Sequence, residues 1–281
     1  TIAAAIAAAK IHVAVVHIEA GLRSFNKAMP EELNRIAADH MSTLLFVPTA
    51  AGMKNLAKEG FDLNIKAEAK IDAPNVYHCG DIMYDNSLYF AKMNAGRRSI
   101  LADLDLEDSP YILSTIHRDS NTDDPRALQQ IFEALLQLID QTNMQVVLPL
   151  HPRTTAKMKH LLKEDFQEKI SSNQQLIICP PAGFLDMIAL EQNAQLIITD
   201  SGGVQKEAYF FQKPCVILRE QTEWIEVVES GAAILCGADQ EKIINAVHEL
   251  LNKSIQTDAS IFGDGQAARF ICEKIISDLP C

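Results

Sequence analysis

The chain has 281 residues, 48% of them hydrophobic and 22% charged, so it can bury a full core in one large domain or two medium ones. Its formal net charge of −12 argues against a nucleic acid or an anionic membrane as partner, because either would be repelled overall. No apolar run is long enough to span a membrane, and the first residues lack a signal-peptide pattern. The six cysteines show neither CxxC nor His-paired spacing, which predicts free thiols in the cytoplasm and no metal site.

Helix and strand patterns alternate in the first part of the chain. They predict a helix over residues 1–9, a strand over 12–18, a helix from Pro30, a strand over 44–47, a helix over 50–59, a strand over 76–79 and a helix over 81–93. About three strands are too few for a sheet covered on both faces, and the chain opens inside a helix that no strand precedes. We therefore expect this domain to be incomplete at its N-terminus.

The second part of the chain restarts the alternation after residues 94–109, which lose apolar periodicity. Strands are predicted over 111–116, 145–150, 176–179, 196–199, 215–218 and 234–235, and helices over 125–139, 155–162, 184–192, 203–211, 241–251 and 266–276. This order predicts an α/β fold of two Rossmann-like domains with parallel sheets and a cleft between them. The predicted division is 1–94 for the rest of the first domain, 95–109 for a linker, 110–262 for the second domain, and 263–281 for a C-terminal helix that packs back on the first.

The segment Thr199–Ala208 has the pattern of a strand, a tight turn and a helix. Ser201 can cap the helix, while Gly202 and Gly203 let backbone N–H groups approach a ligand without an intervening Cβ atom. A helix N-terminus of this kind favours a phosphate or diphosphate. Glu207, about one turn into the helix, could reach a ribose hydroxyl. From this pattern alone, a plain strand-to-helix turn remains an equal alternative.

Polar residues also follow other predicted strands at their carboxyl ends, where open α/β sheets bind ligands. They are Glu19, His117, Arg118 and His151. With the turn at Ser201 they describe a cleft suited to an anion and to acid–base chemistry. Plainer interpretations stay open, because Glu19 can pair with Arg23, Glu31 can be a first-turn acid of a helix, and each His–Arg pair can be structural.

Six motifs together resemble one family in order and spacing. They are His17–Arg23, Met29–Arg35, Thr115–Arg118, His151–Thr154, Thr199–Ala208 and Thr222–Trp224. From end to end, the chain resembles the non-hydrolysing UDP-N-acetylglucosamine 2-epimerases. The stretches Gly80–Met83 and Pro214–Val216 and the Glu-Trp form of the last motif are most similar to the branch that includes UDP-2,3-diacetamido-2,3-dideoxyglucuronate 2-epimerases.

The resemblance implies a glycosyltransferase-B type of fold, a UDP-sugar substrate held between two domains, and no cofactor. It implies epimerisation at C2 of UDP-N-acetylglucosamine through a 2-acetamidoglucal, for surface polysaccharide precursors, by a homodimer in the cytoplasm. Glu19 and Glu31 would serve proton transfer, and His117 and the Ser201–Gly203 turn the diphosphate. The resemblance further assigns the ribose to Glu207, the uracil to Phe184, substrate binding to Arg23, and a second, regulatory UDP-sugar to Arg118 and His151.

Three departures from the family pattern stand out. Asp119-Ser120-Asn121 replaces the usual Glu-Asn pair, and Trp224 stands where many members carry an arginine, which removes a cation near the substrate. Family chains also carry a segment before the position of Thr1 that contacts substrate. Three alternatives therefore stay open: the same chemistry on the diacetamidoglucuronate, a glycosyltransferase of the same fold, and a non-catalytic UDP-binding remnant.

Overall fold

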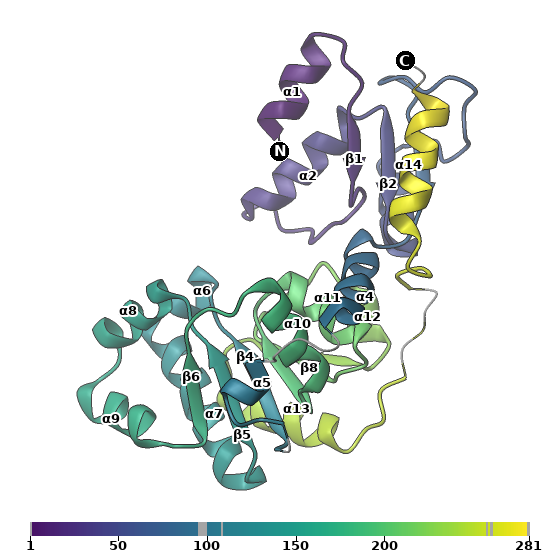
Figure 1. Cartoon of the computed structure of the whole chain (residues 1–281). Coiled ribbons are helices and arrows are strands. Elements are labelled where there is room, and N and C mark those ends of the chain that lie inside the picture. The colour runs from purple at the N-terminus through teal and green to yellow at the C-terminus, as the bar shows by residue number, and fades with distance from the viewer. Residues whose placement is uncertain (1, 95–99, 108, 257, 259–260, 280–281) are drawn as a thin grey trace. The chain divides into compact units, whose positions relative to one another are not determined.

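The computed structural model describes residues 2–94, 100–107, 109–256, 258 and 261–279. The chain separates into two compact units, of which the first comprises Thr1–Leu88 with Asp258–Cys281 and the second Tyr89–Thr257 (Figure 1). Each unit is built from a parallel sheet and helices, so the predicted α/β class is confirmed. The chain passes from one unit to the other within a helix, α4 (Ile82–Asn94), whereas the predicted first domain ends at residue 94.

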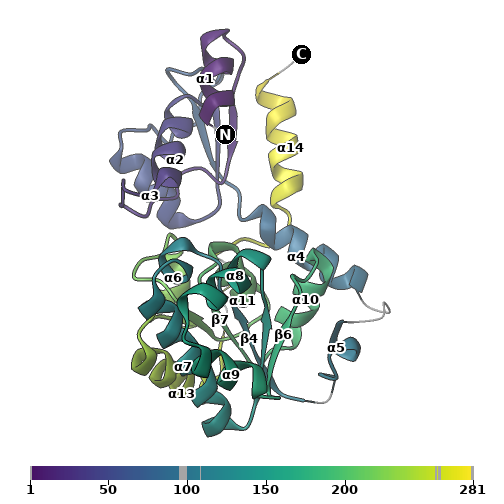
Figure 2. The ribbon, with the colours of Figure 1, turned by 90° about the vertical axis from the view of Figure 1, so that its left-hand side faces the viewer.

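The first unit has a three-stranded parallel sheet in the order β1-β2-β3. The strands are β1 (Val16–Ile18), β2 (Leu44–Val47) and β3 (Asn75–His78), and the other helices are α1 (Ile2–Lys10), α2 (Pro30–His40), α3 (Ala50–Lys58) and α14 (Ala267–Asp278). Because side chains alternate along a strand, β2 contributes side chains to two cores. Leu45 and Val47 pack with Leu56 of α3, and Leu44 and Phe46 lie on the opposite face. Figure 2 shows α2 and α3 on one side of these strands and α14 on the other.

Helix α14 closes the second core of this unit although it comes from the far end of the chain. Its Ile271 packs with Phe46 and with Tyr77 of β3. The Tyr77 hydroxyl donates to the Asp278 carboxylate at 2.5 Å, and Asn75 Nδ2 donates to the same oxygen at 2.8 Å. The unit is therefore completed by residues about two hundred positions away in sequence.

The second unit has a six-stranded parallel sheet in the order β6-β5-β4-β7-β8-β9. Its strands are β4 (Tyr111–Thr115), β5 (Gln145–Pro149), β6 (Leu176–Cys179), β7 (Leu196–Thr199), β8 (Cys215–Ile217) and β9 (Ala233–Leu235). Counted from β4, this is the strand order 3-2-1-4-5-6 of the doubly wound nucleotide-binding folds. The direction of winding reverses between β4 and β7, and such a point is where these folds bind ligands.

Helices cover both faces of this sheet (Figure 2). They are α5 (Ile100–Asp103), α6 (Asp119–Thr122), α7 (Pro125–Thr142), α8 (Pro152–Leu161), α9 (Glu164–Ser172), α10 (Phe184–Asn193), α11 (Gly202–Phe210), α12 (Ile225–Glu229) and α13 (Gln240–Leu251). The main core lies between the sheet and the two long amphipathic helices α7 and α13, through residues such as Phe132, Val146, Ile198 and Val247. Helix α11 packs against β7 and β8. It begins at Gly202, shortly after β7 ends at Thr199, so its N-terminus lies at the carboxyl end of that strand.

Some predicted boundaries differ from the structure for local reasons. Strand β1 begins at Val16 rather than at residue 12, because His12 has a left-handed φ of 58° that no strand residue adopts. The predicted linker 95–109 contains helix α5, whose Leu101 is buried, while residues 95–99 and 108 lie outside the described part. Within the described residues, no helix is both long and apolar enough to cross a bilayer.

Candidate functional site

The site of the second unit lies where β4 and β7 end side by side. The hydroxyls of Thr115 and Thr199, the last residues of these strands, are hydrogen-bonded at 2.6 Å. His117 and Arg118 follow β4, and Asp200 and Ser201 follow β7. The predicted strand-end clusters around His117 and Ser201 are thus brought together at the point where the winding reverses.

Asp200 is the centre of this cluster and is fully buried, with 0% of its surface exposed. Its Oδ2 accepts hydrogen bonds from the backbone N–H groups of His117 and Arg118 and from Asn121 Nδ2, each at 3.0 Å. Asn121 Nδ2 also donates to the carbonyl of Leu218 at 3.0 Å, which ties the cluster to the end of β8. The carboxylate therefore fixes the loop after β4 against the loop after β7.

The remaining oxygen of Asp200 lies 2.9 Å from His117 Nδ1. Burial raises the pKa of Asp200, but the hydrogen bond and charge of His117, with the donors Arg118 N and Asn121 Nδ2, outweigh it and hold the pKa below its ordinary value. An ionised partner on Nδ1 selects the tautomer that carries the proton on that nitrogen. His117 Nε2 is then the nitrogen available for a ligand, and the side chain is 52% exposed.

The first turn of α11 is organised around Ser201 and Gly202. The Ser201 hydroxyl accepts from the N–H of Val204 at 3.4 Å, so Ser201 is the N-cap as predicted. The Ser201 N–H itself donates to the Thr199 hydroxyl at 2.9 Å. A Cβ atom on Gly202 would lie only 2.7 Å from Glu223 Oε1, which explains the glycine. The turn offers the positive end of the α11 dipole to an anion.

The other predicted residues of this unit differ in burial and in the contacts that they make. Arg118 is half-buried, and its Nε donates to the carbonyl of Asp200 at 3.0 Å. Glu207 is buried on α11. Burial of Glu191 on α10, and then the nearby charge of Glu207, raise the pKa of Glu191. His151 is exposed and caps α8 by accepting from the N–H of Arg153 at 3.3 Å. Phe184, half exposed at the start of α10, packs edge-on against Phe90 with ring centroids 5.1 Å apart.

In the first unit, the predicted carboxylates lie around the loop between β1 and α2. Glu19 directly follows β1 and has a left-handed φ of 65°, a strained conformation for a residue with a side chain. Glu31 is exposed on the first turn of α2, whereas its neighbour Glu32 is buried. Glu32 accepts from the N–H groups of Ser24 and Phe25, both at 2.9 Å. Glu32 therefore holds the loop, and Glu31 is the exposed one of the two acids.

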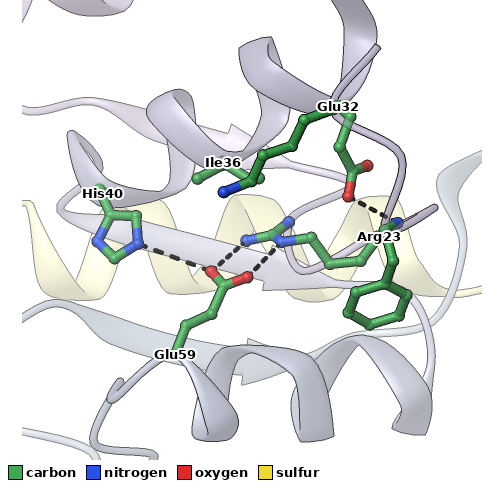
Figure 3. A pocket seen from close by; sticks show the side chains of 7 residues that line it. Arg23, Glu32, Ile36, His40 and Glu59 are labelled. Carbon is green, nitrogen blue, oxygen red and sulfur yellow. Dashed lines mark hydrogen bonds and ion pairs between the residues drawn. The ribbon is translucent and has the colours of Figure 1, made fainter. Parts of the chain in front are cut away.

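Arg23 is buried in a network of charged side chains at the edge of a pocket of about 630 Å³ (Figure 3). Its guanidinium makes two 2.7 Å bonds to Glu59 and one to Asp39, and Asp39 also binds His17 Nδ1 at 2.6 Å. Burial lowers the pKa of Arg23, but the bonds to Glu59 and Asp39 outweigh it and raise that pKa. Each guanidinium nitrogen donates within this unit, so the arrangement supports a role in positioning the loop.

Sequence reasoning overlooked Asp200, Asn121, Glu32 and Asp39. The available signal for Asp200 was an acid directly after a buried strand and before a capping serine. Asn121 was noted only as part of a departure from the family pattern, and its bonds to Asp200 and Leu218 join residues that are distant in sequence. Among the described residues, no group of three or more His, Cys, Asp or Glu side chains is arranged to hold a metal ion.

A family model, curated relatives and solved structures match nearly the whole chain. The family model UDP-N-acetylglucosamine 2-epimerase matches residues 1–276. A UDP-2,3-diacetamido-2,3-dideoxy-D-glucuronate 2-epimerase of Pseudomonas aeruginosa is 44% identical over 276 residues, which cover 98% of this chain and 71% of the relative. A UDP-N-acetylglucosamine 2-epimerase of Methanocaldococcus jannaschii is 37% identical over 96% of this chain and 70% of its own length. The crystal structure of the M. jannaschii UDP-GlcNAc 2-epimerase with UDP-GlcNAc and UDP matches with a TM-score of 0.86 at 36% identity, over 98% of this chain and 72% of that one.

Proposed function

This chain belongs to the UDP-N-acetylglucosamine 2-epimerase family, whose members are isomerases, and on that premise we propose that it interconverts UDP-N-acetylglucosamine and UDP-N-acetylmannosamine. The product would serve as a precursor of surface polysaccharide. The observation that carries the proposal is the His117–Asp200 pair beside the glycine turn of α11, where the sheet reverses its winding. That arrangement suits a diphosphate that must depart and return.

The proposed reaction starts with loss of UDP from C1 of the sugar. The C1–O bond electrons pass to the diphosphate, a base removes the C2 proton, and the C2–H electrons form the double bond of a 2-acetamidoglucal. UDP then adds back after C2 is protonated on the opposite face. The first turn of α11 favours the negative charge on the departing diphosphate, and His117, in the form protonated on both ring nitrogens, can donate from Nε2 to one of its oxygens. Asp200 keeps the imidazole oriented for that role.

Proton transfer at C2 is proposed for Glu19 and Glu31. The strained backbone of Glu19 supports its part, because such strain of about 1–3 kcal/mol persists where surrounding structure and function maintain it. The exposure of Glu31 leaves its carboxylate accessible. Phe184 is proposed to contact the uracil and Glu207 the ribose. A homodimer and a regulatory UDP-sugar at Arg118 and His151 stay predictions.

The test is hydrogen exchange at C2. Incubation of UDP-N-acetylglucosamine with the purified protein in D₂O should place deuterium at C2 of both epimers. Glu19→Gln and His117→Ala should each lower turnover at least about a hundredfold, the scale of one acid–base group. Glu68→Gln and His160→Ala are matched controls at exposed positions and should keep parental rates. Parental rates in Glu19→Gln and His117→Ala would contradict the assigned roles.

A second substrate is favoured by one observation, the 44% identity to the epimerase of UDP-2,3-diacetamido-2,3-dideoxy-D-glucuronate. Both UDP-sugars should be compared in the same exchange assay. The one with the higher kcat/KM identifies the preferred sugar. Release of UDP without C2 exchange would indicate a glycosyltransferase instead, and UDP binding without either reaction a non-catalytic UDP-binding protein.

A further inference from the structure

The proposed reaction leaves one buried carboxylate of the first unit unexplained. Asp39 lies on the last turn of α2 and is fully buried, with 0% of its surface exposed. A carboxylate in this place is unfavourable for two reasons, because burial removes its hydration and because the C-terminal end of a helix carries a partial negative charge. Such a group persists only where donors from the rest of the unit compensate its charge.

The compensating donors come from both sides of Glu19 in the sequence. Asp39 Oδ1 lies 2.6 Å from Nδ1 of His17, which comes two residues before Glu19. Asp39 Oδ2 accepts from the N–H of Gly21, two residues after Glu19, at 3.1 Å. It also accepts from Nη2 of Arg23 at 2.7 Å. One carboxylate of α2 thus binds the chain both before and after the acid that is proposed for proton transfer.

The segment after Glu19 is also held by α3. Asn55 Nδ2 donates to the carbonyl of Gly21 at 3.0 Å. A Cβ atom on Gly21 would lie 2.6 Å from the carbonyl oxygen of Gly52, so only a glycine lets the loop approach α3 this closely. The backbone of Gly21 is therefore bound at its N–H by Asp39 and at its carbonyl by Asn55.

These contacts explain the backbone conformation of Glu19. Its left-handed φ of 65° is unfavourable for a residue with a side chain and persists where the surrounding structure imposes it. Because His17 and Gly21 are both bound to Asp39, the chain between them has to turn within a short span. Glu19, the middle residue of that span, takes the left-handed conformation.

We propose that Asp39 is a positioning residue, which directs the Glu19 carboxylate by fixing the chain on either side of it. The inference rests on the proposed function, because that function assigns the proton transfer at C2 to Glu19. Asp39 acts through Glu19 and transfers no proton itself. A misplacement of about 1 Å can lower a rate about a hundredfold, so a carboxylate that exchanges a proton with one carbon atom depends on such support.

The first experiment measures the effect on the backbone and needs no activity. The equilibrium constant of unfolding in urea is compared for Glu19→Gly and Glu19→Ala, in the parent and in Asp39→Asn. Glycine adopts a left-handed φ without the cost of a Cβ atom, so Glu19→Gly should be the more stable by about fivefold in that constant. With Asp39→Asn residue 19 can relax, and the difference should fall below about twofold. Asp140→Asn, at an exposed acid on the last turn of α7, is the matched control and should keep the fivefold difference.

The second experiment measures turnover and C2 exchange. Asp39→Asn should lower kcat about tenfold to a hundredfold while KM stays within about threefold, because Glu19 is misdirected and the nucleotide contacts proposed for the second unit are unchanged. Adding Asp39→Asn to Glu19→Gln should cause no further loss. His17→Leu should lower kcat about tenfold. His17→Asn should restore most of that loss, since Asn Nδ2 and His Nδ1 are both bonded to Cγ and can make the same bond to Asp39.

An undiminished difference between Glu19→Gly and Glu19→Ala in the Asp39→Asn background would overturn the inference. So would a parental kcat in Asp39→Asn, or a further loss when it is added to Glu19→Gln, because the effect would then not pass through Glu19. Equal losses in His17→Leu and His17→Asn would contradict it too, since they would mark the imidazole itself as the group that matters.

If Asp39→Asn fails to fold, His17→Leu replaces it in both experiments, with His17→Asn as the variant that keeps the bond. The proposed function fails separately, since absence of C2 exchange in the parent contradicts the epimerase and leaves the unfolding comparison intact.

Discussion

Replacing Asp200 by asparagine should both destabilise the second unit and impair catalysis. The change conserves size but removes a charge on which the N–H groups of His117 and Arg118, the Asn121 amide and the His117 ring converge. An asparagine offers one acceptor oxygen, and its NH₂ group would face a donor. At least one buried donor therefore loses its partner.

The magnitude follows from the type of bond. Hydrogen bonds to a charged group contribute about 1.5–3 kcal/mol each, and breaking a buried ion pair costs about 3–5 kcal/mol. We expect a loss of about 3 kcal/mol in the free energy of unfolding, since Oδ1 of the asparagine keeps part of the network. Turnover should fall at least about a hundredfold, because His117 loses the partner that selects its tautomer.

Urea unfolding followed by circular dichroism measures the first effect, with Asp119→Asn as control. Asp119 pairs with Arg153 at the surface, so its replacement should cost less than about 1 kcal/mol. The pKa of Asp200 is depressed, so its contribution to stability is present above the ordinary carboxyl pKa of 3.8 and is lost as the pH falls through the depressed value. The difference between parent and Asp200→Asn should therefore be constant near neutrality and shrink in acid. A cost below about 0.5 kcal/mol at neutral pH would refute the reasoning.

Three further variants test other contacts. Gly202→Ala should leave the unfolding free energy nearly unchanged, because alanine favours the helix while its Cβ displaces Glu223, and UDP affinity measured by calorimetry should fall about tenfold. Burial and then the bond to Asp278 raise the pKa of Tyr77 to about 12, so the stability it contributes is present below pH 10 and lost as the pH rises through 12. Tyr77→Phe should lack this alkaline loss in unfolding curves taken across that range. Glu32→Ala should make residues 24–29 more sensitive to limited proteolysis, and trypsin cleavage there at the parental rate would contradict the role of Glu32.

Local patterns predicted the strands and the helix cap well. Leu44–Val47 and Leu196–Thr199 were predicted with their observed bounds, because each is a short, fully buried apolar run between polar residues. The cap at Ser201 was also predicted, since it depends on its own neighbours in sequence. Features whose physical cause is local are therefore accessible from the sequence.

Features that depend on contacts between distant parts of the chain could not be predicted from the sequence. Asp200 binds Asn121 and His117 across 79 and 83 residues, which no local pattern records. Glu31 and Glu32 are adjacent on α2, and the one that faces the rest of the unit becomes buried. In the structure Glu32 is buried and Glu31 is exposed. Helix α9 was missed for a related reason: it is largely polar, and burial of Ile170 against the main core stabilises it.

The packing of α14 against β3 determines the order in which the two units can fold during synthesis on the ribosome. Leu44, Phe46 and Tyr77 emerge early, but Ile271, which completes their core, is synthesised about two hundred residues later. The second unit is continuous in sequence and can fold during that interval. The first unit cannot complete its core until α14 is made, so the apolar side chains that α14 covers stay exposed until then. A prematurely terminated chain that ends before α14 would hence be a target for chaperones and proteases, even though it contains the entire second unit.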